Sequence, residues 1–198
     1  MVEEMTKVNN NYGAISIDSN VFYRYGYKLK NSIISQLQQF KGGGIKVIQS
    51  DIVHRECLSH IIEKYESCEQ SIRKSIREIN KYSEENSDEI ERVLGELAPL
   101  IEPHDKALTK LSSFYDDVGM EIIESNEHVK LESIVDMYFD FIPPFEKNEK
   151  KRYEFPDAIA LKSLESWAKK NGTKILAVSD DKGWSEFAEG NDSIDVIN

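Results

Sequence analysis

Short apolar runs alternate along this chain with longer amphipathic segments. Buried strands are predicted at the runs 14–17, 45–48 and 175–178, with a final edge strand at 194–197. Helices are predicted between them, over about 21–40, from 51 onward, and over 104–124, 129–141, 156–170 and 182–189. Strands that alternate with helices are typical of an α/β domain with an open parallel sheet.

A long amphipathic helix is predicted after the second strand. Apolar residues recur at every third or fourth position from Leu58 to Tyr82, with near-heptad spacing. The polar stretch SEENS at 83–87 interrupts this stripe, and a second long helix returns over 104–124. We therefore predict a helical hairpin at about 63–127, inserted within a single domain of residues 1–198. Such a hairpin suits a lid, a docking surface or the interface of a homodimer.

Composition narrows the class of protein. The chain has 198 residues and a formal net charge of -11, which argues against a passive nucleic-acid coat protein. A nuclease is still compatible with this charge, because bound metal ions and a local basic rim can offset the acidic field. Cys57 and Cys68 are too far apart along one helix for a disulfide, and no apolar stretch is long enough to span a membrane. We expect a cytoplasmic protein with no membrane partner.

Four acidic residues follow the predicted strands or stand in the helical turns beside them. They are Asp18, Glu56, Asp157 and Asp181. The ligand crevice of an open parallel sheet lies at the carboxyl ends of its strands, so these carboxylates are expected to converge there. Their mutual repulsion calls for a cation, and hard oxygen ligands favour Mg²⁺ or Mn²⁺. The pattern predicts metal-assisted hydrolysis of a phosphate ester.

At these positions the chain resembles the PIN-domain nuclease family. The matching pieces are IDSNV at 17–21, the strand, turn and helix that end in Glu56, FPDAIAL at 155–161 and ILAVSDDKGW at 175–184. The resemblance implies a three-layer α/β/α sandwich with a central parallel sheet, and an endoribonuclease that cleaves RNA, or less typically single-stranded DNA. It also implies that the four acids form the catalytic metal cluster, supported by Asn20 and Ser179.

Two positions depart from the family pattern. Gly183 stands where the family has its last acid, which would reduce a second metal site. Asp180 stands where the family often has a neutral polar residue, so Asp180 and Asp181 compete for the fourth position of the cluster. The alignment favours Asp181, with Asp180 in a supporting role.

A cationic loop precedes Asp157. It contains Lys147, Lys150, Lys151 and Arg152, interrupted by two glutamates. The loop is either a solvated connection or a rim that binds substrate phosphates, and we assign substrate binding to its last three cations. Tyr153 and Phe155 would add base stacking.

Two other functions compete with the nuclease. A binding module would keep the fold without catalysis and recruit a partner through the hairpin. A phosphatase of the haloacid-dehalogenase type would use Asp18 as nucleophile, but it needs an acid where Asn20 stands, and an amide cannot protonate a leaving group. Among nucleases, a free-standing domain of this size suggests a toxin or defence effector that an inhibitor protein restrains. This last suggestion rests on analogy alone.

Overall fold

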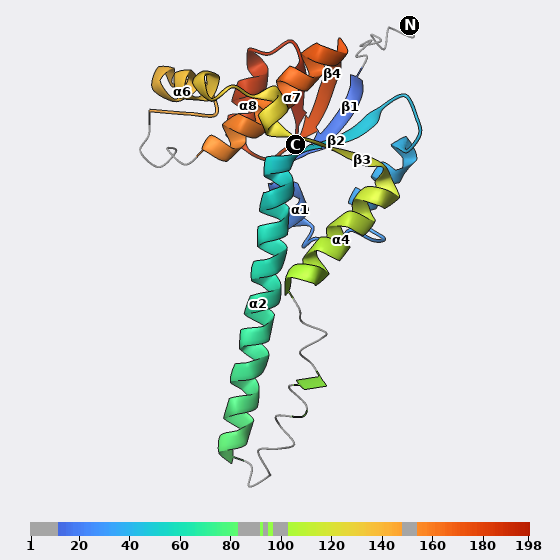
Figure 1. Cartoon of the computed structure of the whole chain (residues 1–198), viewed down its shortest axis with the longest axis vertical. Helices are drawn as coiled ribbons and strands as arrows, with labels where there is room; N and C mark the ends of the chain where they lie inside the picture. Colours follow the sequence, from blue (N-terminus) through green and yellow to red (C-terminus); the bar gives the residue numbers. More distant parts are fainter. Residues whose placement is uncertain (1–11, 83–91, 93–94, 97–102, 148–153) are drawn as a thin grey trace, which may run out of the picture.

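The apolar runs of the sequence become one parallel sheet (Figure 1). The computed structural model describes residues 12–82, 92, 95–96, 103–147 and 154–198. Its strands are β1 (Tyr12–Ile17), β2 (Lys46–Ser50), β3 (Met120–Ile123), β4 (Lys174–Val178) and β5 (Ile194–Ile197). Within the described residues they form a five-stranded sheet in the order β3-β2-β1-β4-β5, and every neighbouring pair is parallel.

The helices cover both faces of this sheet. They are α1 (Ser19–Arg24), the 3-10 helix η1 (Ile34–Phe40), α2 (Asp51–Tyr82), α4 (Pro103–Val118), α5 (Ser125–His128), α6 (Leu131–Asp140), α7 (Phe155–Asn171) and α8 (Lys182–Glu189). Right-handed crossovers place α1, α2 and α4 on one face and α7 and α8 on the other, as Figure 1 shows. This arrangement confirms the predicted three-layer α/β/α sandwich.

The core fills the space between these layers. It contains apolar residues from the sheet and from the inner faces of α7 and α4: Ala14, Ile17, Val47, Ile48, Ile175, Ala177, Leu161, Leu164, Leu111 and Phe114 are each 5% exposed or less. Strand order reverses between the central strand β1 and its neighbour β4. A reversal of this kind opens a ligand crevice outside the carboxyl ends of the strands. We therefore expect a functional site at the residues that follow Ile17 and Val178.

Two predicted helices are wrong in part. The helix predicted over 21–40 ends at Arg24, because Gly26 and Tyr27 have φ angles of 59° and 52°, which a right-handed helix does not allow. The helix predicted over 104–124 ends at Val118, where Gly119 has a φ angle of 68°. The residues after Gly119 form β3, which pairs with β2 in the register Val47 to Met120.

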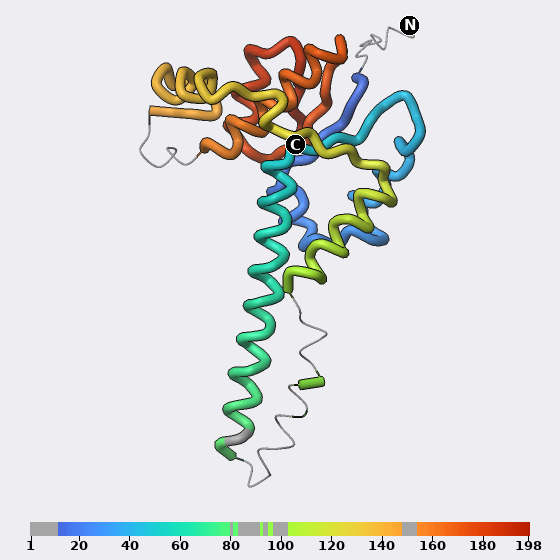
Figure 2. Tube along the Cα trace, in the orientation of Figure 1, coloured from blue at the N-terminus to red at the C-terminus, as the bar shows by residue number. Residues whose placement is uncertain are grey.

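Helix α2 extends well beyond the body of the protein, and α4 lies beside it and runs back to the sheet (Figures 1 and 2). Its apolar residues are buried as far as Ile61, whereas Ile79 and Tyr82 are 61% and 87% exposed. Ala107, Leu111 and the other inward residues of α4 belong to the core, as does part of β3. An insertion at about 63–127 therefore stays a prediction, and the projecting part of α2 is the segment that best fits it.

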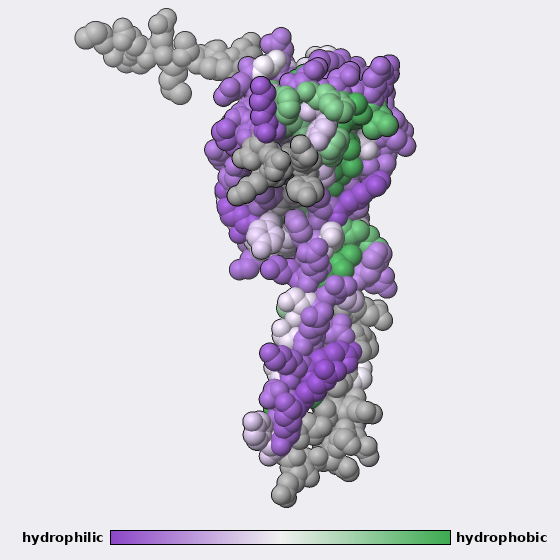
Figure 3. All heavy atoms as spheres, turned by 90° about the vertical axis from the view of Figure 1, so that its left-hand side faces the viewer, coloured by the Kyte–Doolittle hydropathy of each residue, from purple (hydrophilic) through white to green (hydrophobic). Residues whose placement is uncertain are grey.

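Apolar residues also reach the surface at α6. Figure 3, which faces this side, shows apolar atoms gathered on the body of the protein. The exposed apolar residues of α6 and of the turn after it are Leu131, Val135, Phe139, Phe141 and Ile142. None of the helices in the described ranges has both the length and the apolar character that crossing a membrane requires.

Candidate active site

Asp18 is the first residue after β1 and lies at the point where strand order reverses. Its backbone N–H donates to the carbonyl of Val178 at 2.9 Å, which holds the ends of β1 and β4 together. Its carboxylate caps α1 by accepting from the backbone N–H of Ser19 at 2.6 Å. The other carboxylate oxygen accepts from the hydroxyl of Ser179 at 2.6 Å. Asp18 is only 3% exposed, and these hydrogen bonds hold its carboxylate in one orientation.

The protonation of Asp18 depends on two other acids. The pKa of Asp18 is raised to about 7. Burial is the largest cause, the nearby charges of Asp157 and Glu56 act in the same direction, and the hydrogen bond from Ser179 acts against them. Residues distant in the sequence thus act on one carboxyl group. The structure brings Asp18, Glu56 and Asp157 into one electrostatic cluster, which we call the acid cluster.

Glu56 enters this cluster from the second turn of α2. It is half-buried, and the pKa of its carboxyl group is raised, first by burial and then by the charge of Asp157. A hydrogen bond from the Ser19 side chain and the proximity of His60 act in the opposite direction. The charge of Glu56 therefore acts from a helix on Asp18 at the strand end.

Asp157 stands in the first turn of α7, where a carboxylate also complements the helix dipole. One of its oxygens accepts from the indole N–H of Trp184 at 2.8 Å. Trp184 is completely buried, so this bond fixes Asp157 against the rigid start of α8. Sequence reasoning did not assign a role to Trp184.

Asp181 and Asp180 are separated by their contacts. The backbone N–H of Asp181 donates to the Ser179 hydroxyl at 3.0 Å, and its side chain caps α8 by accepting from the N–H of Gly183 at 2.6 Å. Asp180 is exposed and accepts from Arg24 at 2.6 Å. Asp181 is therefore connected to Asp18 through the hydroxyl of Ser179, whereas Asp180 forms an ion pair with Arg24 at the surface.

Gly183 has no room for a side chain. A Cβ atom built there would lie 2.8 Å from Cβ of Pro144 and 3.0 Å from an Asp181 carboxylate oxygen. The family pattern carries an acid at this position. Here the close packing of α8 against the loop at Pro144 leaves no space for an acidic side chain.

Asn20 lies beside the same hydroxyl. Its amide nitrogen is 3.4 Å from the Ser179 oxygen, at the long end of hydrogen-bond distances. Its amide oxygen is buried and has no hydrogen-bond partner among the described residues. This oxygen adds a neutral hard ligand next to Asp18, which a cation or a water molecule would satisfy.

The donor set fits a divalent cation in its chemistry. It consists of carboxylate oxygens whose negative charges raise one another's pKa, together with the unsatisfied amide oxygen of Asn20. A bound cation would relieve that repulsion, and oxygen ligands suit Mg²⁺ or Mn²⁺. In the part of the chain that the structure describes, no three His, Cys, Asp or Glu side chains are arranged to enclose a metal ion. The side chains would have to move closer together to bind one.

A hollow of about 580 Å³ opens next to this cluster. Ser19 and Asn20 line it from α1, and Tyr23, His60 and Lys64 are among the residues on its other walls. His60 lies four residues after Glu56 on the same face of α2, a spacing from which the sequence could have placed it near the site. The predicted substrate-binding residues Lys150, Lys151 and Arg152 lie outside the described residues.

Comparison with known proteins gives one match. A family model described as a PIN domain matches residues 15–184, which is more than half of the chain and includes all four predicted acids. Neither the search of curated proteins nor the search of solved structures finds a match. PIN domains are generally nucleases, and they usually use divalent metal ions.

Proposed function

This chain belongs to the PIN domain family, and we propose that it is a metal-dependent endoribonuclease whose centre is the acid cluster. The observation that carries the proposal is that Asp157 and Glu56 both raise the pKa of the buried Asp18 at the strand reversal. A bound cation would relieve the mutual repulsion of these three carboxylates. Strongly shifted acids in a crevice are characteristic of functional sites.

Asp18, Glu56, Asp157 and Asp181 would hold Mg²⁺ or Mn²⁺, with the amide oxygen of Asn20 as a further neutral ligand. When bound, the cation would lower the pKa of the attacking water and offset the charge of the leaving oxygen. The protein keeps its ligands oriented: Ser179 holds Asp18, and Trp184 holds Asp157. Glu56 and Asp157 are half-buried, so solvent water reaches them, and we assign them the orientation of the attacking water. No serine or cysteine nucleophile is needed.

The direct test is cleavage of a mixed RNA pool and of single-stranded DNA in Mn²⁺, Mg²⁺ or EDTA. Asp18→Asn and Asp157→Asn should abolish metal-dependent cleavage and still fold, whereas Asp136→Asn, on the exposed side of α6, should behave as wild type. Melting temperature gives a second readout, because a cation that binds only the folded protein raises it. Full activity in either cluster variant would overturn the site assignment.

A catalytically weak binding module is the second candidate. The observation in its favour is that no three acidic, histidine or cysteine side chains in the described ranges are arranged to hold an ion. This module would bind RNA or a partner protein without cutting. It is supported if neither metal changes the melting temperature and no substrate is cleaved, and it is excluded if cleavage requires metal and is lost in Asp157→Asn.

The cellular role is proposed by analogy. A free-standing nuclease domain suggests a cytoplasmic toxin or defence effector held in check by an inhibitor protein, and the projecting part of α2 offers a surface for that partner or for a second copy of the chain. Expression without the partner should arrest growth, and the Asp18→Asn variant should not. Harmless expression of an active enzyme would argue against the role.

A further inference from the structure

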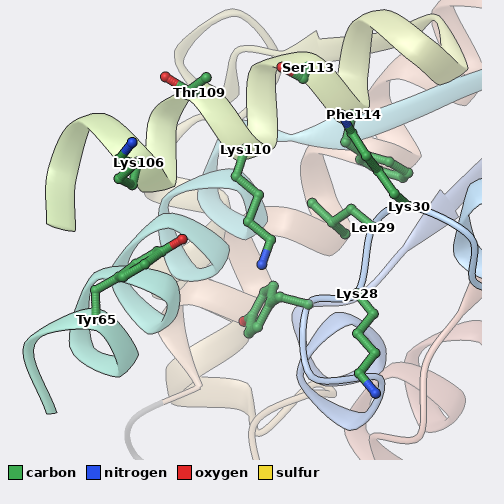
Figure 4. Close-up of a pocket in the computed structure, with 10 residues that line it drawn as sticks. Lys28, Leu29, Lys30, Tyr65, Lys106, Thr109, Lys110, Ser113 and Phe114 are labelled. Carbon is green, nitrogen blue, oxygen red and sulfur yellow. The ribbon is translucent and has the colours of Figure 1, made fainter. Parts of the chain in front are cut away.

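A second cavity, of about 500 Å³, lies where the loop after α1 meets α2 and α4 (Figure 4). Lys28 and Lys30 reach it from the loop, and Lys106 and Lys110 reach it from α4. Tyr65 of α2 closes another wall. We call this cavity with its four lysines the lysine pocket.

The four lysines have no ion-pair partner among the described residues, although the chain has a net charge of -11. Other lysines of the chain do form ion pairs, such as Lys46 with Glu121 and Lys174 with Asp195. In an acidic protein, four cations around one cavity that have no ion-pair partner in the described part of the chain indicate a site for an external anion.

The loop is built to present these cations. Tyr27 and Leu29 are each 4% exposed and anchor the loop in the core, so the alternate residues Lys28 and Lys30 turn outward. The Tyr27 hydroxyl lies 2.9 Å from a ring nitrogen of His60, which ties the loop to α2. Tyr27 also has a φ angle of 52°, a costly conformation for a residue with a side chain, and such strain is concentrated at functional sites.

Lys110 extends from α4 into the space between the helices and the loop (Figure 4). It is half-buried, and burial lowers the pKa of its amine. A cation that loses hydration in this way gains most from a bound anion, because the anion restores the lost electrostatic stabilisation.

The lysine pocket and the hollow beside the acid cluster each share lining residues with a third cavity. This smaller cavity, of about 150 Å³, shares Lys64 with that hollow and shares Tyr65 and Lys110 with the lysine pocket. The three cavities thus follow one another around α2, from the face that carries His60 and Ser67 to the face that carries Tyr65. From Glu56 to Tyr65 the helix rises about 14 Å at 1.5 Å per residue, so a ligand that occupies both ends must be an extended one.

We propose that the lysine pocket binds the phosphates of a single-stranded RNA several nucleotides away from the bond held at the acid cluster. The inference rests on the proposed function in taking this ligand to be the substrate. A single strand is favoured over a small phosphate ester because the three cavities are connected in series by shared lining residues, and because aromatic side chains accompany the cations. Tyr23 is 53% exposed at one end and Tyr65 lines the other, and tyrosine rings provide stacking surfaces for bases.

The experiment measures binding without catalysis. Fluorescence anisotropy in EDTA follows a labelled single-stranded RNA of about 16 nucleotides, within the range of known single-strand sites, over a series of salt concentrations. The test variant combines Lys28→Gln, Lys30→Gln and Lys106→Gln. The matched control combines Lys74→Gln, Lys130→Gln and Lys170→Gln, which are equally exposed and have no ion pair among the described residues. Lys110→Gln serves as a single-site variant.

The pocket variant should bind RNA about 10- to 100-fold more weakly near 0.1 M salt, with a salt slope reduced by about two, since each phosphate contact on a single strand contributes about 0.7. The control should match wild type, and Lys110→Gln should fall between them. In Mn²⁺, the pocket variant should cleave the long RNA less efficiently but an RNA dinucleotide as well as wild type, because a dinucleotide cannot reach the pocket.

Two results overturn the inference and leave the proposed function intact: metal-dependent cleavage with RNA affinity unchanged in the pocket variant, or equal losses in the pocket and control variants. If instead no protein cleaves RNA in any metal but the pocket variant alone loses affinity, the proposed function fails and RNA binding at the pocket stands.

Discussion

The hydroxyl of Ser179 lies 2.6 Å from a carboxylate oxygen of Asp18, and both residues are buried. The same hydroxyl oxygen accepts the backbone N–H of Asp181 at 3.0 Å. One oxygen atom therefore connects the first residue after β1 with the residues that follow β4. The hydrogen bond from Ser179 holds the Asp18 carboxylate in place, and it also lowers the pKa of Asp18.

Replacing Ser179 with alanine should make Asp18 harder to ionise. The serine hydrogen bond lowers the pKa of Asp18, so its loss should move the acidic limb of the cleavage rate profile to higher pH. The buried N–H of Asp181 also loses its acceptor, at a cost of about 1–3 kcal/mol in the free energy of unfolding. Ser179→Thr keeps the hydroxyl and should restore the wild-type profile. An unmoved limb in Ser179→Ala would show that Asp18 does not control the rate.

The stability of the metal-free protein should depend on Asp18 between about pH 4 and pH 7. The pKa of Asp18 is about 7 in the folded state and near 3.8 when unfolded, so the folded state binds the extra proton within this window. The free energy of unfolding therefore loses a contribution as pH rises, by about 4 kcal/mol for a shift of this size. Asp18→Asn does not titrate and should escape this loss.

Urea unfolding in EDTA at several pH values measures this difference. Asp18→Asn should be close to wild type at pH 4 and more stable than wild type at pH 8. A stability difference that does not change with pH would contradict the assigned pKa.

The neighbours Asp180 and Asp181 should differ in their contribution to cleavage. Asp180 is engaged with Arg24 at the surface, so Asp180→Asn should keep most of the activity and lose at most about 1 kcal/mol of stability. Asp181→Asn removes the charge next to Ser179 and should reduce cleavage at least 10-fold. Initial rates in saturating Mn²⁺ compare the two variants. The reverse ranking would place Asp180 in the fourth position of the cluster.

Alanine substitution should affect stability differently at Gly183, in the first turn of α8, and at Gly190, which follows the helix. At Gly183 the added methyl group would press on Pro144 and Asp181, and we expect Gly183→Ala to cost about 1–3 kcal/mol in the free energy of unfolding. At Gly190 an added Cβ meets no atom within 4 Å, and Gly190→Ala should be nearly neutral. Thermal unfolding of both variants measures the difference, and equal melting temperatures would contradict the packing described at Gly183.

The indole of Trp184 should affect activity through Asp157. Trp184→Phe keeps most of the buried ring but removes the N–H that Asp157 accepts, so cleavage or metal affinity should fall about 10- to 100-fold. Trp167 is only partly buried in α7 and serves as the control, since Trp167→Phe should leave metal affinity unchanged. Titration of Mn²⁺ against the melting temperature reports affinity in both variants. Equal affinities would show that the indole does not position Asp157.

The ends of helices were predictable from the sequence where local residues such as proline and glycine determine them. Pro156 and Gly172 mark the ends of α7, and the predicted helix over 182–189 agrees with α8. Strand β3 was not predictable in the same way. Val118 and Ile122 continue the apolar spacing of α4, so periodicity extends the helix through them, and β3 forms only because β2 offers it an edge. Gly119 was the one local sign of the break.

The site was predictable to the level of backbone position. Asp18 and Asp181 follow strands, and a parallel sheet brings such residues to one edge. The direction of the Asp18 and Asp157 carboxylates was not predictable, because it depends on partners distant in the sequence, Ser179 for Asp18 and Trp184 for Asp157. The lysine pocket was missed for the same reason, since its cations come from two segments that no motif connects.

The central pairing of β1 with β4 also determines when the protein can become active during its synthesis. Ser179 lies 161 residues after Asp18, and the strand that carries it to the site must be added to the middle of the sheet. Contacts so distant in sequence form late and slowly. A nascent chain that has not yet released β4 from the ribosome has neither the completed sheet nor the Asp18–Ser179 contact. For the proposed ribonuclease, this order of assembly would leave the messenger RNA that encodes it uncut until translation of the domain is nearly finished.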